Sequence, residues 1–225
     1  MGGWQPKPDY LARVMQRGGR PHALEMIYPA RTALIVVDMQ RYFVAEGMPA
    51  GSPQVRALVP VIAGFAGALR DAGGTIAWVL TDGSPDFTGD WSSYKALFSP
   101  ESWARRETLL APDGAGYPLA DGLDALPGDV ISVKRRHSSF AEGSSDLDAQ
   151  LRARGIDTVL VAGTATGVCC GGTARDAMAR GYHAVMLADA LAAQTQEEHE
   201  AALSLHYLYF GDVRTTGEIA GMLAR

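Results

Sequence analysis

Cysteine is scarce in this sequence: its 225 residues include two, and these are adjacent, at Cys169 and Cys170. Two neighbouring cysteines cannot supply a disulfide framework, and a bridge between them would be strained, so we expect both thiols to be reduced. The sequence also lacks an apolar run approaching the roughly 20 residues that span a bilayer. Its polar N-terminus lacks the apolar core of a secretion signal. These features predict a soluble, cytoplasmic protein.

Positive charge is not in excess either. Lys and Arg total 20 against 25 Asp and Glu, which gives a formal net charge of −5. This balance gives no reason to expect nucleic acid or an anionic membrane as a partner. Hydrophobic residues make up 47% and charged residues 20%, as in ordinary globular proteins. The length suits one large α/β domain. We expect an N-terminal arm over residues 1–30, with a helix near 8–17, and one domain over 31–225.

Five short runs have the β-branched, apolar and nearly uncharged composition of buried parallel strands. They cover residues 32–38, 75–81, 129–135, 157–163 and 183–189, and a sixth short strand is expected near Asp212–Val213. Helical patterns cover residues 55–74, 144–155, 171–181, 196–211 and 216–224. Thr195 and Glu198 fit a capping box for the fourth of these helices. The alternation predicts a single-domain, doubly wound (Rossmann-like), mostly parallel sheet of about six strands, with helices on both faces.

One long segment, residues 83–127, departs from this alternation. It is rich in proline, glycine, serine and aromatic residues. Long excursions of this kind in a compact domain are typical of lids and binding loops. We therefore expect it to cover or line a site.

Three chemically different groups fall at the carboxyl ends of predicted strands, which is where open parallel sheets bind ligands. They are Asp38, Lys134 and Cys169, the last in a glycine-rich turn that begins at Gly163. A cysteine near a helix N-terminus is expected to favour the thiolate, the attacking form. Asp38 could take the thiol proton and return it to a leaving amine, while Lys134 would favour both anions.

Backbone N–H groups of the turn could stabilise an oxyanion. Together these features suggest a cysteine hydrolase with an acyl-enzyme intermediate. Each residue also has a simpler interpretation. Free cysteines commonly pack in cores, an aspartate at a strand end is often a turn or helix cap, and Lys134 with the two following arginines could form a solvated edge. Taken singly, none of the three decides the matter.

Three sequence motifs resemble those of the isochorismatase-like cysteine hydrolases, over about residues 31 to 221. They are "ALIVVDMQRYF" (33–43), "VISVKRRHSSF" (130–140) and "VAGTATGVCCGGTARDA" (161–177). The resemblance implies Asp38 as acid/base, Lys134 as the catalytic lysine and Cys169, not Cys170, as the nucleophile. It also implies a non-proline cis peptide at Thr164–Ala165, with the N–H groups of Ala165 and Cys169 as oxyanion donors.

The sequence differs from particular branches of the family, and these differences exclude some of the family's activities. The nicotinamidase branch binds a divalent metal through histidines shortly after the first strand, but here no histidine occurs between His22 and His137. We therefore expect no metal and no other cofactor. The isochorismatase branch proper, which cleaves a vinyl ether, lacks the cysteine. The surrounding sequence most resembles the ureidoacrylate hydrolase and N-carbamoyl amidase branch.

Three functions are therefore weighed. The first is a metal-independent hydrolase that cleaves a C–N bond of a small linear amide or ureido (N-carbamoyl) acid. The second is an ester or vinyl-ether hydrolase on the same scaffold. The third is a binding module without catalysis, which is disfavoured because no G-x-G-x-x-G motif follows the first strand.

Aromatic and polar residues near the motifs and in the excursion are candidates for substrate binding, although any of them could instead pack. They are Gln40, Arg41, Phe43, Trp91, Tyr94, Trp103, Arg136 and Phe140. Arg41 or Arg136 could pair with a substrate carboxylate. The family resemblance also implies a homodimer or homotetramer, with the N-terminal arm and residues 83–127 as plausible contacts.

Overall fold

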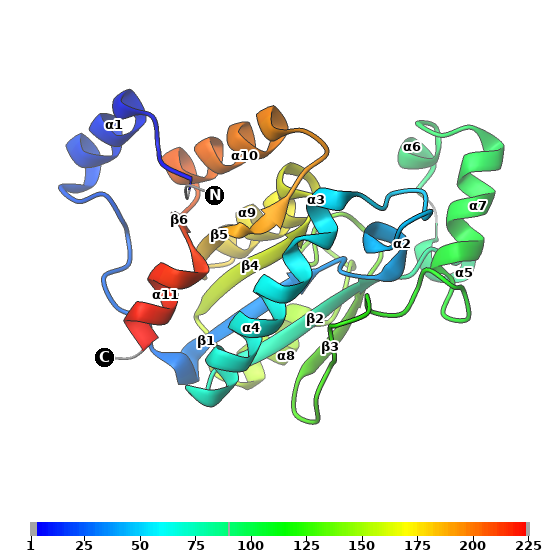
Figure 1. Cartoon of the computed structure of the whole chain (residues 1–225), viewed down its shortest axis with the longest axis horizontal. Helices are drawn as coiled ribbons and strands as arrows, with labels where there is room; N and C mark the ends of the chain where they lie inside the picture. Colours follow the sequence, from blue (N-terminus) through cyan, green and yellow to red (C-terminus); the bar gives the residue numbers. More distant parts are fainter. Residues whose placement is uncertain (1–3, 90, 224–225) are drawn as a thin grey trace.

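The fold is built on one sheet of parallel strands, as seen in a computed structural model that describes residues 4–89 and 91–223. Within these residues the strand order is β3-β2-β1-β4-β5-β6, and each neighbouring pair is parallel (Figure 1). The strands are β1 (Thr32–Val37), β2 (Thr75–Thr81), β3 (Val130–Lys134), β4 (Thr158–Thr164), β5 (His183–Ala192) and β6 (Asp212–Arg214). The predicted doubly wound sheet is confirmed, and the strand order reverses between β1 and β4.

Helices cover both faces of this sheet (Figure 1). One face packs against α3 (Pro53–Arg56), α4 (Leu58–Asp71) and α11 (Thr216–Leu223). The other packs against α8 (Leu147–Ala153), α9 (Gly171–Ala179) and α10 (Gln196–Tyr209). The predicted capping box of Thr195 and Glu198 is present at the start of α10.

Strand β1 shows why both faces need a helical layer. Leu34 and Val36 belong to the apolar core beneath α4, and Ile35 and Val37 belong to the core beneath α8 and α9. All four side chains are at most 1% exposed. A continuous apolar run is therefore a strand buried on both sides, which is the pattern that the sequence predicts for a parallel sheet.

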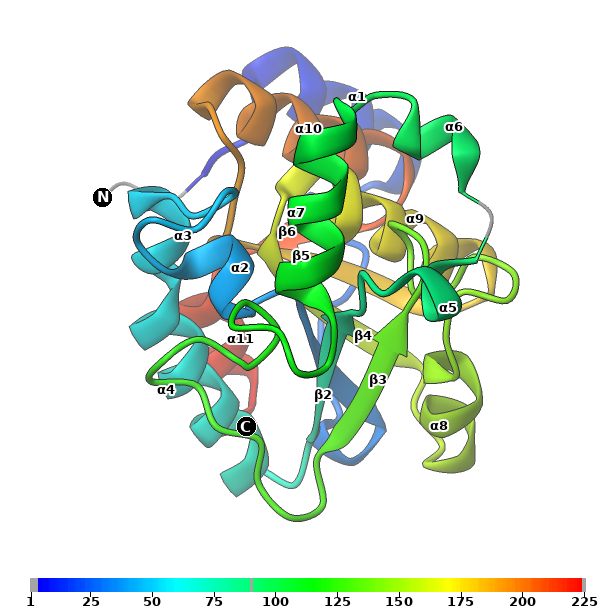
Figure 2. The ribbon, with the colours of Figure 1, turned by 90° about the vertical axis from the view of Figure 1, so that its right-hand side faces the viewer.

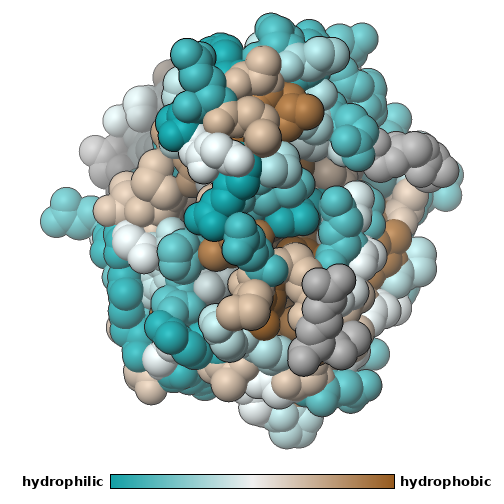
Figure 3. Space-filling model, turned by 90° about the vertical axis from the view of Figure 1, so that its left-hand side faces the viewer, coloured by the Kyte–Doolittle hydropathy of each residue, from teal (hydrophilic) through white to brown (hydrophobic). Residues whose placement is uncertain are grey.

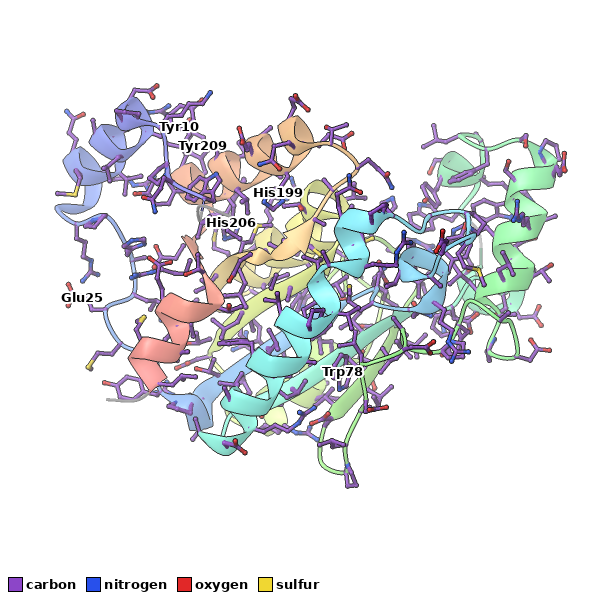
Figure 4. The ribbon with its side chains drawn as sticks, viewed as in Figure 1. Tyr10, Glu25, Trp78, His199, His206 and Tyr209 are labelled. Atoms are coloured by element: carbon purple, nitrogen blue, oxygen red, sulfur yellow. The ribbon has the colours of Figure 1, made fainter. Side chains whose placement is uncertain are left out.

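The N-terminal segment packs on the outside of α10. Its helix α1 (Pro8–Gly18) lies beside α10, and Tyr10 and Tyr209 mark the two elements in Figure 4. The guanidinium of Arg13 donates to the hydroxyl of Tyr209 at 2.6 Å, and the hydroxyl of Tyr207 donates to the carbonyl of Pro21 at 2.8 Å. Figure 3 shows that this side of the molecule is largely polar, with apolar residues in small separate patches. The arm is thus held by its own chain.

The excursion of residues 83–127 is helical and irregular. It contains α5 (Pro85–Thr88), α6 (Ser92–Lys95) and α7 (Pro100–Leu110), and it follows β2. Figure 2 shows these helices grouped over the carboxyl ends of the strands, close to the short helix α2 (Arg41–Val44). A 3-10 turn, Pro29–Arg31, leads into β1. None of the described helices is long and apolar enough to cross a membrane.

A glycine allows the end of β4 to approach β1 closely. Gly163 has a φ of +113°, and a Cβ built there would lie 2.1 Å from the carbonyl oxygen of Val37. No side chain fits that space, and L-residues avoid that conformation. The close approach brings the turn after β4 against the residue that follows β1, which is Asp38.

Candidate active site

Four strand ends meet at the edge of the sheet beneath the excursion. Asp38 follows β1, Thr81 ends β2 and Lys134 ends β3. Cys169 lies in a π-helical turn, Thr166–Cys170, between β4 and α9. In register, Thr81 is the partner of Lys134 on the neighbouring strand. The parallel sheet therefore places these side chains together although they are far apart in the sequence.

Asp38, Thr81 and Lys134 form a buried polar cluster. The Thr81 hydroxyl donates to Oδ1 of Asp38 at 2.7 Å and accepts from Nζ of Lys134 at 2.7 Å. Nζ of Lys134 lies 3.0 Å from Oδ2 of Asp38, and these two charged side chains are 2% and 1% exposed. Thr81 thus links Asp38 and Lys134 from β2, the strand that lies between β1 and β3.

The backbone of Asp38 is also unusual. Its φ is +55°, the left-handed region that few residues other than glycine adopt. Oδ2 is buried and has no aligned hydrogen-bond donor, although it faces the charge of Lys134. This oxygen is therefore open to accept a proton from a neighbouring group.

Cys169 lies against this cluster and is partly exposed. Its Sγ is 3.5 Å from Nζ of Lys134. Burial lowers the pKa of Lys134, but the negative charge of Asp38, with smaller contributions from Cys169, outweighs this effect and the pKa is raised. The lysine therefore stays protonated and presents a positive charge to the sulfur.

The surroundings of Cys169 oppose the thiolate that its place near a helix N-terminus was expected to favour. Burial, followed by the negative charge of Asp38, raises the pKa of the Cys169 thiol to about 12, although Lys134 acts in the opposite direction. The residue lies in the π-helical turn that precedes α9, not in the first turn of an α-helix. The thiol is therefore protonated at neutral pH, and attack requires that its proton be taken by a base.

His137 is a second group beside the sulfur, with Nδ1 3.6 Å from Sγ of Cys169. Its ring packs edge-on against Trp91 and Tyr94, with centroids 4.9 and 4.7 Å away. Burial, followed by the positive charge of Lys134, lowers the pKa of His137, so the imidazole is neutral at neutral pH. Two groups can therefore exchange a hydrogen bond with the thiol, the carboxylate of Asp38 and the imidazole of His137.

The turn that carries Cys169 is anchored from below. Thr164 and Ala165 are joined by a cis peptide bond, as the family resemblance implies, and both residues line the pocket. Thr166 Oγ1 lies 2.9 Å from Nδ1 of His199, which α10 supplies (Figure 4). Cys170 is fully buried, with its Sγ 3.8 Å from the carbonyl of Ala162. Of the two thiols, Cys169 faces the pocket and Cys170 faces the core.

A pocket of about 220 Å³ opens above Cys169. Four predicted substrate-binding residues line it: Phe43, Trp91, Tyr94 and Arg136. The catalytic candidates Asp38, Lys134 and Cys169 line it as well. Other lining residues were not predicted, among them Tyr42, Ala50, Thr81, Asp82, Thr88, Phe98, Arg106, Arg135, His137, Val168 and Gln194.

Two of the predicted substrate-binding residues act elsewhere. Gln40 is fully buried, donates to the carbonyls of Thr81 and Tyr117, and accepts from the Thr81 N–H at 2.7 Å. Its amide is therefore used to hold the end of β2 in place. Arg41 lies outside the pocket and forms an exposed ion pair with Asp121 at 2.7 Å. Its charge is therefore engaged outside the pocket.

Two aromatic predictions are also corrected. Trp103 is 4% exposed and packs behind the pocket, with its ring centroid 5.9 Å from that of Tyr94. Phe140 is 2% exposed and packs on Tyr182 in the core beneath α8 and α9. Both side chains are too deeply packed to line the pocket, although Trp103 supports a ring that does.

Three of the residues that line the pocket were not predicted, because the sequence gives only weak indications of their position. Thr81 ends a predicted strand, as do Asp38 and Lys134, so its place at the same edge of the sheet could have been predicted. His137 follows Lys134 by three residues, within the quoted motif. Arg106 lies in α7 next to another arginine, and a single sequence contains nothing to distinguish the two.

Metal-ligating side chains do not cluster in the described part of the chain. No group of three or more histidine, cysteine, aspartate or glutamate side chains there could hold an ion. The expectation of a metal-independent reaction therefore stays a prediction, which chelation would test.

Comparison with known proteins identifies the family. The isochorismatase domain model matches residues 32–218. The chain belongs to the isochorismatase family. It is 35% identical to the ureidoacrylate amidohydrolase RutB of Methylobacterium radiotolerans over 212 residues, covering 88% of this chain and 80% of that protein. It is 36% identical to the RutB of Cronobacter sakazakii over 187 residues, covering 76% and 78%.

A solved structure shows the same fold over most of the chain. The cysteine hydrolase from Pseudomonas syringae pv. phaseolicola 1448A superimposes with a TM-score of 0.81 at 29% identity, covering 91% of this chain and 98% of that chain. The predicted family and the predicted α/β architecture are thus confirmed.

Proposed function

We propose that this protein is a metal-independent cysteine hydrolase that cleaves a C–N bond of a small linear amide or ureido acid through a thioester on Cys169. The observation that carries the proposal is the placement of its Sγ. It lies 3.5 Å from the ammonium of Lys134, beside the carboxylate of Asp38, in the wall of the pocket. Relatives that match most of this chain are named amidohydrolases, which supports the reaction type.

The proton transfers follow from the contacts. Asp38 takes the proton of the Cys169 thiol, whose raised pKa makes a base necessary. The sulfur forms a bond to the substrate carbonyl carbon, and the charge on the oxygen is stabilised by the N–H groups of Ala165 and Cys169. When the C–N bond breaks, Asp38 returns the proton to the departing nitrogen, which leaves as ammonia.

Water then completes the reaction. Asp38, again a carboxylate, takes a proton from water, and the resulting hydroxide attacks the thioester carbonyl. The C–S bond breaks and the sulfur recovers its proton. Throughout, Lys134 keeps its positive charge within 3.0 Å of Asp38 and 3.5 Å of the sulfur, so it stabilises whichever of the two is negative.

Ammonia release from a substrate panel tests the reaction type. We expect the purified protein to release ammonia from one or more ureido acids, N-carbamoyl amino acids or simple linear amides. A matched set of esters gives the comparison, since ester hydrolysis releases no ammonia. Hydrolysis of esters alone would favour the ester or vinyl-ether alternative, and no turnover of any compound with no labelling of Cys169 by thiol reagents would favour a binding module.

Chelation tests the absence of a metal from the reaction. After dialysis against EDTA or phenanthroline, ammonia release is expected to continue at its original rate, because the proposed steps use side chains and water alone. Metal analysis of the active preparation is expected to show less than stoichiometric zinc, iron and manganese. Activity that is lost on chelation and restored by one added metal would contradict the proposed mechanism.

We also propose that the chain acts as a cytoplasmic homodimer or homotetramer, as the family resemblance implies. The N-terminal arm is already packed against α10 of its own chain. Light scattering of the purified protein would report the assembly directly.

A further inference from the structure

The helix α7 places a buried positive charge in the wall of the pocket. Arg106 is 7% exposed and lines the pocket. Its side chain forms no hydrogen bond or ion pair with any described residue, and its Nη1 is enclosed without a partner. Burying a guanidinium without a counter-charge is strongly unfavourable. The guanidinium of Arg106 is therefore available to an anion or a strong acceptor in the pocket.

Aromatic rings fix the position of this charge without neutralising it. The guanidinium carbon lies 5.7 Å from the ring centroid of Tyr94 and 5.3 Å from that of Trp103. Another partly buried arginine is paired with a carboxylate: Arg70 donates two hydrogen bonds to Asp129, at 2.7 and 3.0 Å. At Arg106 the described residues hold the guanidinium in place but supply no carboxylate.

The two carboxylates of the wall, Asp38 and Asp82, have other partners. The Lys134 ammonium is paired with Asp38. Oδ1 of Asp82 accepts from the N–H and the hydroxyl of Ser84. Neither carboxylate of the wall is therefore bonded to Arg106.

Arg106 and the reacting sulfur line the same pocket and are linked through two rings of its wall. The Tyr94 ring that contacts its guanidinium lies 4.7 Å from the ring of His137, and Nδ1 of His137 lies 3.6 Å from Sγ of Cys169. All four residues line the same pocket of about 220 Å³. A small linear molecule whose carbonyl carbon meets Cys169 can therefore extend its far end to Arg106.

We propose that Arg106 binds the carboxylate of the substrate and thereby makes the enzyme select acidic ureido or amide substrates over neutral ones of equal length. The inference rests on the proposed function, because it takes this pocket to be the substrate site. A planar guanidinium matches a carboxylate in geometry as well as charge. From the sequence, Arg41 and Arg136 were candidates for this role. Arg41 lies outside the pocket, and Arg136 donates to the carbonyl of Thr88.

The kinetic test compares β-ureidopropionate with N-propylurea, in which a methyl group replaces the carboxylate. Arg106→Met is expected to lower kcat/KM for β-ureidopropionate by about 10- to 150-fold, the range for a lost hydrogen bond to a charged group. The loss should appear mainly in KM, and the rate with N-propylurea should change little. Arg106→Lys should recover part of the affinity. Arg105→Met, an exposed neighbour on the same helix, is the control and should change neither rate.

A binding measurement separates this inference from the proposed function. β-Ureidopropionate and N-carbamoylglycine are titrated by calorimetry into Cys169→Ala and into Cys169→Ala/Arg106→Met. An affinity at least tenfold weaker in the double variant would support the carboxylate site. If the wild type nevertheless released no ammonia, only the proposed reaction would fail. Equal affinities of the two variants, or no binding to either, would overturn the carboxylate site. Equal kinetic losses for acidic and neutral substrates would do the same. Each result would count against the site even if the wild type hydrolyses neutral amides.

Protein stability provides a check on folding. Because Arg106→Met removes an unpaired buried charge and keeps most of the side-chain volume, the thermal midpoint of the free protein is expected to stay unchanged or rise. A large fall would show that the arginine supports the fold, and that result would count against a binding role.

Discussion

Replacing Cys169 with alanine is expected to abolish ammonia release, by an amount on the order of 10⁴–10⁶-fold, as for loss of a catalytic nucleophile. Cys169 lines the pocket and contacts both Lys134 and His137. Cys170→Ala is the matched control. Its thiol is fully buried and lies near the carbonyl of Ala162, so it cannot reach the substrate. We expect that variant to keep most of its activity.

Steady-state ammonia release measures both variants, with circular dichroism to confirm that each is folded. Cys170→Ala removes a small core side chain, so a modest loss of thermal stability is expected there without loss of rate. Activity that depends on Cys170 and survives the loss of Cys169 would show that the nucleophile is assigned one residue too early.

Asp38→Asn and Lys134→Ala are expected to shift the pKa of the Cys169 thiol in opposite directions. The charge of Asp38 raises that pKa and the charge of Lys134 lowers it. Removing Asp38's charge should therefore lower the thiol pKa and speed alkylation at a fixed, mildly alkaline pH. Removing Lys134 should raise the pKa and slow alkylation. The Cys170→Ala background ensures that the label reports on Cys169.

Turnover is nevertheless expected to fall in both variants. Asp38→Asn removes the proton acceptor, so ammonia release should drop by the roughly 10²–10⁴-fold typical of a lost general acid/base. Faster alkylation together with slower hydrolysis is a result that a merely structural role for Asp38 would not give. Lys134→Arg should not restore the wild-type rate, because a planar guanidinium does not fit a site made for a compact ammonium.

Two controls accompany these variants. Removing one member of a buried ion pair leaves the other uncompensated, at a cost of about 3–5 kcal/mol of stability, so thermal unfolding must be measured for each. His137→Gln shows whether the imidazole shares the proton transfer. Near-normal hydrolysis by Asp38→Asn that is lost when His137 is also replaced would move the role of base from the carboxylate to the imidazole.

The sheet could be predicted because its strands are buried on both faces. Apolar runs such as 32–37 and 158–164 are typical of parallel strands buried between two layers of helices. The positions of Asp38 and Lys134 follow from that sheet, since each lies at the carboxyl end of a strand. The motif around Cys169 then indicated which of the two neighbouring cysteines is the nucleophile.

The rest of the site depends on tertiary contacts that no local pattern reveals. Gln40 and Arg41 are adjacent to a strand end, yet one is saturated by backbone groups and the other points to Asp121. Arg106 lines the pocket because α7 lies over the carboxyl ends of the strands, whereas Arg105 remains exposed. The raised pKa of Cys169 follows from burial, which a residue's place in the sequence does not reveal.

The central claim is that Cys169 forms a covalent intermediate, and acid-quenched intact-mass analysis during turnover measures this most directly. With a substrate identified by ammonia release, the protein mass should rise transiently by the mass of the substrate less one ammonia, and peptide mapping should place the increase on Cys169. Prior alkylation of Cys169 should abolish both the adduct and ammonia release. An adduct on another residue, or undiminished turnover by protein whose Cys169 is fully alkylated, would contradict the claim.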